Sequence, residues 1–417
     1  DQYHYGRWRD LYPEDKLAEL KELVDLGKKT GVEFVWAAHP GGHTDLSDAD
    51  IEAMEAKFDQ LYDIGVRQFA IFFDDSSTNN TRLVEYMNKI QREYVEAKGD
   101  VKPLIFCPQY YNKKNGNESY LRNLRNFDED IQIMWTGDFV VSEINQSVID
   151  YIVNLIERPV FIWWNWPVND LGRANLMHLG PSDALENDIQ NMSGMTSNPM
   201  NQAQASKVAL YSIADYTWNT GTYDSYSSWM RAIAHIITDD EEASQAFQIF
   251  AQNCAAAPMS FPETDESVYL QDDIAAFQNK FLNGEDCSAE TEQLKARFQE
   301  IRDAITTLRG YTGTNNISGE IGPWMNVVDK IAEAGYYTLD HVDEFANLNK
   351  EDDASLQTAM DIINEGRSLL KASTGGKQAA QKVLYPFVEE LLNQLEAKYY
   401  EAIGLAYPET GYGSAGA

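Results

Sequence analysis

The chain has 417 residues, and its 66 acidic and 33 basic side chains give a formal net charge of −33 at pH 7. A surface this negative excludes nucleic-acid backbones and anionic membrane surfaces as expected partners. The length suggests two or three domains with a sizeable buried core. No apolar run reaches the length of a membrane span, and three distant cysteines give neither a metal-binding spacing nor a disulfide framework.

Apolar runs of strand length alternate with helical periodicities through the first half of the chain. Strands are predicted at residues 32–38, 68–73, 102–107, 131–135 and 160–164, with a sixth short apolar segment at 192–195. Helices are predicted at residues 14–29, 47–62, 82–96, 120–126, 145–156 and 203–216.

The spacing of these strands predicts a parallel α/β fold. Their starts recur every 29 to 36 residues, mostly with a helix between them, which is the period of βα units. Because no glycine-rich phosphate loop follows any strand, a β/α barrel fits the sequence better than an open nucleotide-binding sheet. Six strands are fewer than a closed (β/α)8 barrel requires.

The pattern changes after about residue 230, where helical periodicity continues with few strand signals. The clearest helical stretches are 292–309, 324–334 and 377–402. We therefore predict a barrel domain over residues 1–230, a helical bundle domain over 231–405 and a mobile tail over 406–417.

Two adjacent aspartates, Asp74 and Asp75, follow the apolar run Gln68–Phe73. The run has the length and composition of a buried strand, so we expect the carboxylates at its C-terminal end, where parallel α/β folds place their chemistry. Neighbours within a strand face opposite sides. Both carboxylates can therefore meet one substrate only where the chain leaves the strand and turns. The alternative is an aspartate that caps the next helix beside a solvated partner.

Further polar and aromatic groups follow the other predicted strands, and a barrel would bring them to one rim. They are Pro108–Tyr111, Trp135–Gly137, Trp163–Asn165 with Asp170, and Asn198. Aromatic faces stack on pyranose rings, while amides and carboxylates satisfy sugar hydroxyls that cannot stay unpaired once buried. The pattern favours a sugar site. The alternatives are core packing for one tryptophan of the Trp163–Trp164 pair and turn chemistry for the asparagines.

The sequence offers no pattern for a metal, a cofactor or a serine nucleophile. His39 and His43 are four residues apart, but the turn residues Pro40–Gly42 prevent a helix from presenting both on one face. A G-x-S-x-G elbow is absent. We expect no metal and no cofactor, and we interpret Cys107, within an apolar run, as a small buried hydrophobic residue.

These strand-end residues resemble the motifs of glycoside hydrolase family 84. That family contains bacterial β-N-acetylglucosaminidases, sometimes labelled hyaluronidases, and eukaryotic O-GlcNAcases. The matching stretches are 72–75 (FFDD), 133–137 (IMWTG), 163–170 (WWNWPVND) and 197–202 (SNPMNQ). The resemblance covers residues 1 to about 230, with the motifs in order. It implies a (β/α)8 barrel, then an all-helical domain, and a carbohydrate or glycoprotein substrate.

The resemblance also implies substrate-assisted retaining hydrolysis, in which the 2-acetamido oxygen of the sugar replaces the enzyme nucleophile. Asp74 would orient and polarise the acetamido group. Asp75 would protonate the leaving oxygen and then deprotonate the attacking water. One carboxylate must stay ionised while the other holds a proton, and two adjacent negative charges favour that division.

The residues implied to surround the acetamido group and the reacting centre are Tyr111, Trp163 and Asn165. Tyr111 would hydrogen-bond near the acetamido group, Trp163 would form a wall of its pocket, and Asn165 would hydrogen-bond in the same region. The local sequence Pro108–Tyr111, PQYY, differs from the Pro-Thr-Glu-Tyr usual in the family.

The remaining implied contacts lie around the rest of the hydrolysed sugar. Thr136 would line its pocket, Asp170 would bind its outer hydroxyls, and Asn198 would assist Asp170. The family's first two strands have no counterpart, because residues 3–8 (YHYGRW) resemble the loop after the second of them. A separate N-terminal fragment or chain would then complete the barrel.

The resemblance favours a secreted or cell-surface bacterial enzyme, with a cytoplasmic location as the alternative. Two alternative functions stay open. The missing strands motivate a non-catalytic glycan-binding module on a degenerate barrel. The second alternative function is an endo-acting glycosaminoglycan hydrolase. A long polymer substrate would distinguish it from an exo-acting enzyme.

Overall fold

The computed structural model describes residues 1–77, 81–170, 174–256, 264–346 and 348–408. Contacts within the chain divide it into two units, which are treated separately below. The first, here called the strand unit, comprises Asp1–Asn165 and Ala184–Asn198. The second, the helical unit, comprises Trp166–Asp183 and Pro199–Ala417. The predicted domain boundary near residue 230 stays a prediction.

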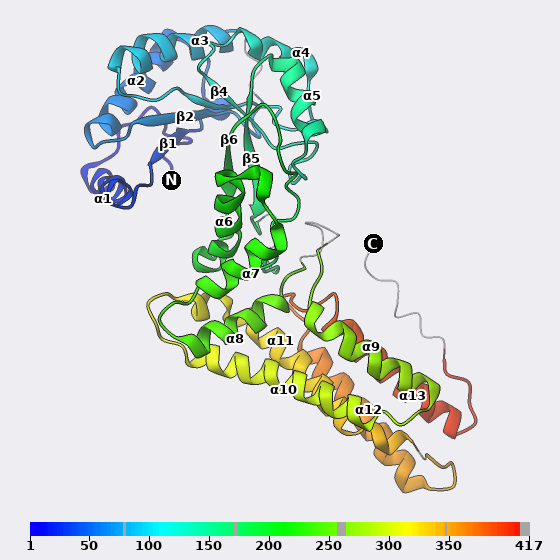
Figure 1. The fold of residues 1–417 in the computed structure, drawn as a ribbon. Helices are drawn as coiled ribbons and strands as arrows, with labels where there is room; N and C mark the ends of the chain where they lie inside the picture. Colours follow the sequence, from blue (N-terminus) through cyan, green and yellow to red (C-terminus); the bar gives the residue numbers. More distant parts are fainter. Residues whose placement is uncertain (78–80, 171–173, 257–263, 347, 409–417) are drawn as a thin grey trace. The chain divides into compact units, whose positions relative to one another are not determined.

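The centre of the strand unit is one parallel sheet that curls into a half-barrel (Figure 1). Its strands are β1 (Val35–Ala38), β2 (Gln68–Phe72), β3 (Ile105–Cys107), β4 (Gln132–Trp135), β5 (Val160–Pro167) and β6 (Met192–Asn198). They lie side by side in sequence order, so β1 and β6 form the two edges. The predicted parallel α/β fold is confirmed, whereas the described strands form half a barrel and not a closed one.

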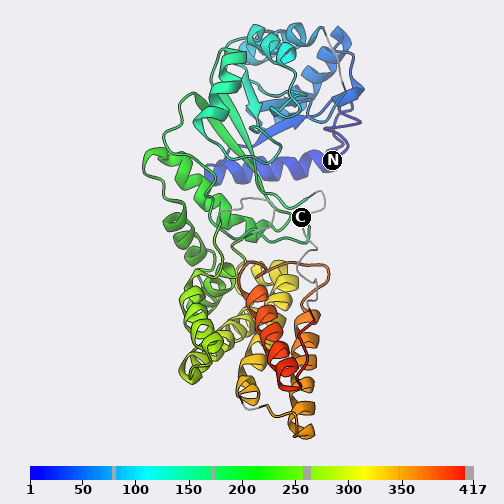
Figure 2. The ribbon, with the colours of Figure 1, turned by 90° about the vertical axis from the view of Figure 1, so that its right-hand side faces the viewer.

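Helices cover the outer side of this sheet (Figures 1 and 2). They are α1 (Glu14–Thr30), α2 (Asp48–Asp63), α3 (Leu83–Ile90), which continues as a π-helical turn at Gln91–Glu96, α4 (Glu118–Asn123) and α5 (Gln146–Ile156). Ser47 caps α2 by accepting a hydrogen bond from the amide of Asp50. Asn145 caps α5 through the amide of Val148.

The predicted elements are all present, with shifted ends. The first strand begins at Val35, because residues 32–34 belong to the turn that follows α1. The strand predicted at 160–164 extends to Pro167, and the short apolar segment becomes a full strand, β6. Polar residues continue β6 beyond its apolar part, so apolar periodicity alone underestimates its length.

The two faces of the sheet differ in how completely they are covered. On the outer face, Phe69 stacks on Phe58 of α2, with ring centroids 4.1 Å apart, and both are fully buried. The inner face carries a smaller cluster built on Ala70, Ile105, Cys107, Tyr111 and Met134, against which partly buried side chains pack. Cys107 is buried, as predicted. The inner face is therefore the more open one.

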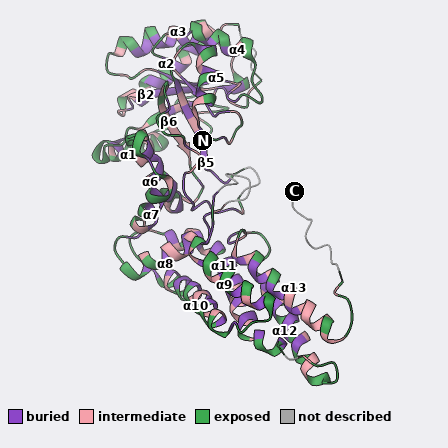
Figure 3. Ribbon diagram, turned by 45° about the vertical axis from the view of Figure 1, so that its right-hand side comes forward, coloured by how far each residue is buried: buried purple, intermediate pink, exposed green. Residues whose placement is uncertain are grey.

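The helical unit contains α6 (Ala203–Trp218), α7 (Ser225–His235), α8 (Glu241–Gln252), α9 (Val268–Asn283), α10 (Ser288–Gly310), α11 (Ile317–Asp340), α12 (Asp353–Ala372) and α13 (Leu384–Ala402). Their buried stripes form one continuous apolar core (Figure 3). The predicted helical character is confirmed, but residues 377–383 precede α13 and are not helical. Among the described residues, no helix has the length and apolarity to span a membrane.

Candidate active site

The two aspartates lie where β2 ends and the chain turns. The amide of Phe73 still donates to the carbonyl of Cys107, at 2.9 Å, and the ladder stops there. Asp75 then adopts a left-handed conformation with φ 51°. This conformation costs a residue with a Cβ about 1–2 kcal/mol. It breaks the alternation of the strand, so that adjacent carboxylates need not face opposite sides of the sheet.

The Asp75 carboxylate has a defined hydrogen-bond donor. The hydroxyl of Tyr111 donates to its Oδ1 at 2.8 Å. Burial of Tyr111, together with its hydrogen bond to Asp75 and the negative charge there, raises the pKa of the phenol well above its usual value. Tyr111 therefore stays protonated and acts only as a donor, which orients one oxygen of an otherwise exposed Asp75.

The Asp74 carboxylate has different surroundings. Its side chain is 20% exposed, and its Oδ1 lies 3.4 Å from Nε2 of His39. Oδ1 is buried and makes no hydrogen bond among the described residues. A buried carboxylate oxygen without a partner is costly. A ligand N–H directed at this oxygen would remove that cost.

The aromatic wall of the site comes from β5 and the end of β3. The rings of Tyr111 and Trp163 lie 5.1 Å apart with an interplanar angle of 44°. Trp163 is half-buried on the inner face, whereas Trp164 is fully buried and donates through Nε1 to the carbonyl of Ser142. Strand alternation predicts this division, with one tryptophan in the core.

Thr136, Asn165 and Asn198 are bonded to protein groups at the same rim. The Thr136 hydroxyl lies 2.8 Å from the carbonyl of Phe139, and Asn165 Nδ2 donates to the carbonyl of Val140 at 2.6 Å. Asn198 Nδ2 in turn donates to Asn165 Oδ1 at 3.0 Å. In this structure Thr136 and Asn165 anchor the loop after β4.

The role of Asp170 stays a prediction. This residue is exposed and belongs to the helical unit, so its position is described apart from the strand unit. The other seven predicted residues (Asp74, Asp75, Tyr111, Thr136, Trp163, Asn165 and Asn198) all belong to the strand unit.

His39 contacts Asp74. The sequence suggested a question about His39 only as a metal ligand. His39 directly follows β1, and its Nε2 lies 2.8 Å from the main-chain carbonyl oxygen of Asp74. The same rule that selected the other strand-end residues would have selected it. Among the described residues, no group of three or more His, Cys, Asp or Glu side chains could hold a metal ion.

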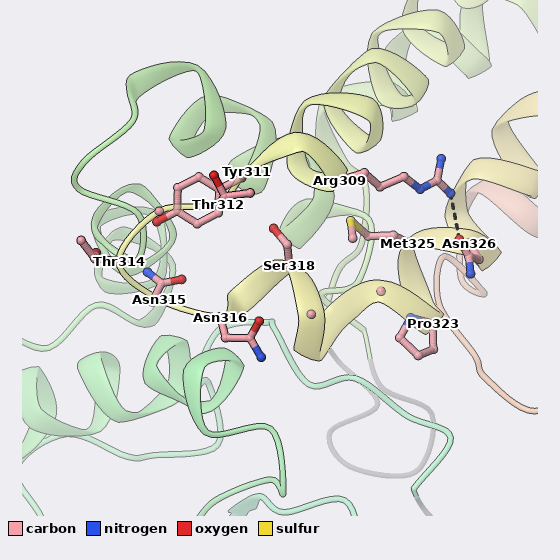
Figure 4. Close-up of a pocket in the computed structure, with 13 residues that line it drawn as sticks. Arg309, Tyr311, Thr312, Thr314, Asn315, Asn316, Ser318, Pro323, Met325 and Asn326 are labelled. Atoms are coloured by element: carbon pink, nitrogen blue, oxygen red, sulfur yellow. Dashed lines mark hydrogen bonds between the residues drawn. The ribbon is translucent and has the colours of Figure 1, made fainter.

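The cavities outside this cluster include two larger ones. One of about 960 Å³ in the strand unit is lined by Ser77, Gln109 and Tyr110, close in sequence to Asp75 and Tyr111, and by residues of α4. The other, of about 800 Å³, lies where α10 leads into α11 (Figure 4). Its Arg309 donates to Asn326 at 2.9 Å, and its Tyr311 donates to Asp239 at 2.7 Å, so part of its polar lining is already bonded within the protein.

Comparison with known families gives two matches. A family described as beta-N-acetylglucosaminidase matches residues 1–252, and one described as hyaluronidase post-catalytic domain-like matches residues 269–388. Curated relatives named Protein O-GlcNAcase, from Rattus norvegicus and Mus musculus, are 27% and 28% identical over 272 residues. The match covers 61% of this chain and 29% of each relative, so the chain spans under a third of their length.

Solved structures share the fold over nearly the whole chain. CpGH84D is 30% identical with a TM-score of 0.86, and the match covers 95% of this chain and 68% of that one. CpGH84B is 29% identical with a TM-score of 0.81, covering 94% and 70%. A mutant of the Thermobaculum terrenum O-GlcNAc hydrolase, at 24% identity and a TM-score of 0.81, covers 97% and 88% and supports the fold alone.

Proposed function

Because the chain belongs to glycoside hydrolase family 84, the β-N-acetylglucosaminidase family, we propose that it hydrolyses terminal β-linked N-acetylglucosamine. The substrate would be a glycan or a protein carrying O-linked N-acetylglucosamine. The single observation that carries the proposal is the pair of carboxylates at the end of β2, where Asp74 and Asp75 have different partners.

Asp74 has the environment that substrate assistance needs. Its Oδ1, which makes no hydrogen bond among the described residues, can accept one from the acetamido N–H of the sugar. That bond would push electron density toward the acetamido oxygen, which attacks the anomeric carbon in place of an enzyme nucleophile. The negative charge of Asp74 would then stabilise the positive charge that develops on the oxazoline-like ring.

Asp75 is placed to transfer protons. Its carboxylate is exposed, and Tyr111 occupies Oδ1. Oδ2 can then carry the proton that goes to the leaving oxygen and can later accept one from the attacking water. The surroundings of the two carboxylates differ, because Tyr111 bonds Asp75 whereas His39 faces Asp74. Asp74 and Asp75 would therefore have different roles in the reaction, because their surroundings differ.

The remaining site residues would bind the sugar. Tyr111 and Trp163, whose rings are in contact, would supply aromatic surface beside the acetamido group. Asn165, bonded to Asn198, would hydrogen-bond near the reacting centre. Thr136 would line the same pocket through the loop that it anchors, and Asp170 would bind the outer hydroxyls. No cofactor enters this reaction scheme.

We propose that the complete fold is a closed (β/α)8 barrel. The edges β1 and β6 are where further strands would pair, and the half-open inner face is the surface that they would cover. A preceding segment, a separate fragment or a second chain could supply them. The family's relatives motivate a secreted or cell-surface location, which fractionation of the natural source would test.

The test is hydrolysis of aryl β-N-acetylglucosaminides by the natural full-length polypeptide, with proton NMR to follow the anomeric configuration. Release of the β-anomer as first product supports the proposal, and release of the α-anomer contradicts retention.

The open inner face motivates a second candidate, a glycan-binding module. Sugar binding without any turnover would favour that candidate. Random cleavage of a long glycosaminoglycan would instead indicate endo action.

A further inference from the structure

His39 and Asp74 leave neighbouring parallel strands at the same edge of the sheet. In the register of β1 and β2, Ala38 is paired with Ile71, so His39 extends from one strand while Phe72 still belongs to the other. The imidazole Nε2 lies 2.8 Å from the Asp74 carbonyl oxygen and 3.4 Å from its Oδ1. One ring nitrogen thus faces both the main chain and the carboxylate of the same residue.

The hydrogen bond to the main chain decides where the His39 proton is. A carbonyl oxygen can only accept, so Nε2 must carry the hydrogen. The other ring nitrogen, Nδ1, is buried and makes no hydrogen bond among the described residues. A Cβ placed on Gly41 would lie 3.2 Å from Nδ1, so the turn after β1 packs closely against that edge of the ring. When the ring is neutral, its proton is therefore on Nε2.

The ring is also fixed from the N-terminal segment. The amide of His39 donates to the carbonyl of His4 at 2.6 Å, and the Tyr5 ring lies 5.2 Å from the imidazole. The imidazole of His39 therefore has little freedom to turn, because its main chain, one face of its ring and its Nδ1 edge all contact other groups. A ring fixed in this way can keep the carboxylate of Asp74 in one position.

Several titratable groups surround His39. Asp74 faces it from the end of β2, with Cys107 of β3 beyond that carboxylate, and His4 and Tyr5 face it from the N-terminal segment, with His43 behind Tyr5. Burial alone would lower the pKa of His39. The hydrogen bond and negative charge of Asp74 outweigh burial, so the pKa lies above its usual 6.5.

We propose that His39 is a positioning residue for Asp74, whose neutral Nε2–H form holds the carboxylate ready to accept the acetamido N–H of the substrate. The proposal rests on the proposed function, because it gives Asp74 the role described there. Protonation at Nδ1 would place a positive charge beside Asp74 and weaken its attraction for the developing charge on the substrate.

The test combines steady-state kinetics with a double-mutant cycle in the full-length polypeptide. His39→Ala is expected to lower kcat by about tenfold to a hundredfold, with KM changed much less. The loss should be the same for aryl leaving groups of high and low pKa, because Asp74 acts on the acetamido group and not on the leaving oxygen. In an Asp74→Ala background, His39→Ala should lower kcat by less than about twofold, because the residue that it positions is gone.

Two further variants separate positioning from folding. His39→Gln keeps an N–H donor and cannot titrate, so it should recover most of kcat at neutral pH and lose the inflection above pH 6.5 that the wild type shows. His43→Ala removes a nearby imidazole that borders Tyr5, and wild-type kinetics are expected. If His39→Ala does not fold, the pH profile of His39→Gln decides alone, and an unchanged inflection overturns the proposal.

The outcomes distinguish this inference from the proposed function. Wild-type kcat in His39→Ala, with Asp74→Ala impaired, overturns the positioning role and leaves the function standing. Independent, multiplicative losses in the double variant also overturn it, because they show that His39 acts apart from Asp74. Wild-type rates in Asp74→Ala would overturn the proposed function itself.

Discussion

The strand unit and the helical unit differ in the kind of side-chain contacts that they make. At the rim of the strand unit, side chains from neighbouring strands contact each other, as His39 does with Asp74 and Tyr111 does with Asp75. The helical unit instead buries one continuous apolar core. Changes at the rim should therefore affect activity more than folding, whereas changes in the helical core should do the reverse.

The largest effect is expected at the carboxylates. Asp75→Ala should lower kcat by about 10²–10⁴-fold for poor leaving groups, because general acid catalysis contributes that much. Activated aryl leaving groups need less protonation and should lose less. Asp74→Ala should impair both kinds of substrate alike. A Brønsted plot of kcat/KM against leaving-group pKa measures the difference, and parallel plots for the two variants would contradict separate roles.

The matching change in the helical unit is Phe298→Ala. Phe298 is 1% exposed, lies 6.1 Å from the ring of Phe387, and also packs against Gly335. The cavity should lower the free energy of unfolding by about 3–5 kcal/mol, with kcat retained at temperatures where the chain stays folded. Denaturant unfolding measures the loss. The control Leu282→Ala removes a side chain that is 66% exposed and should change stability little.

A pH-dependent effect is expected at Glu266 of the helical unit. Burial raises the pKa of its carboxyl to about 7, against the opposing hydrogen bonds from main-chain amides such as that of Lys382. The folded state thus binds this proton more tightly than the unfolded state does. The resulting stability is present below about pH 4.5 and is lost as the pH rises through 7.

Glu266→Gln should remove that dependence. The stability of the wild type relative to the variant should fall by about 2–3 kcal/mol between pH 4.5 and 7.5. Thermal unfolding at several pH values measures it. Glu401→Gln, at an exposed position, is the control and should leave the slope intact. A Glu266→Gln curve parallel to the wild type would contradict the assignment.

The smallest effect is expected at Thr136, where the rim loop is anchored. Thr136→Val removes the hydroxyl that lies 2.8 Å from the carbonyl of Phe139, a bond worth about 1 kcal/mol. A loss of roughly twofold to fivefold in kcat/KM follows if the loop lines the sugar pocket. Thr217→Val, which removes a hydroxyl bonded to the carbonyl of Ile213 within α6, should leave kcat/KM unchanged.

Most of the fold could be predicted from local sequence. The alternation of apolar runs and helical periodicities identified the strands of the half-barrel and the helical second part, because burial imposes those periods on each segment separately. The ends of strands were less accurate where polar residues continue them, as in β6, which runs on to Asn198. Local periodicity could not show which helices pack with which unit.

The sequence by itself determined that two carboxylates follow a buried strand and that one of two adjacent tryptophans must face the core. Both follow from the two-residue period of a strand. Only the tertiary structure decided the partners: Tyr111 lies 36 residues from Asp75, and His39 lies 35 from Asp74. It also decided the left-handed turn at Asp75. Contacts between distant segments depend on how strands align in the sheet, and no local pattern encodes that alignment.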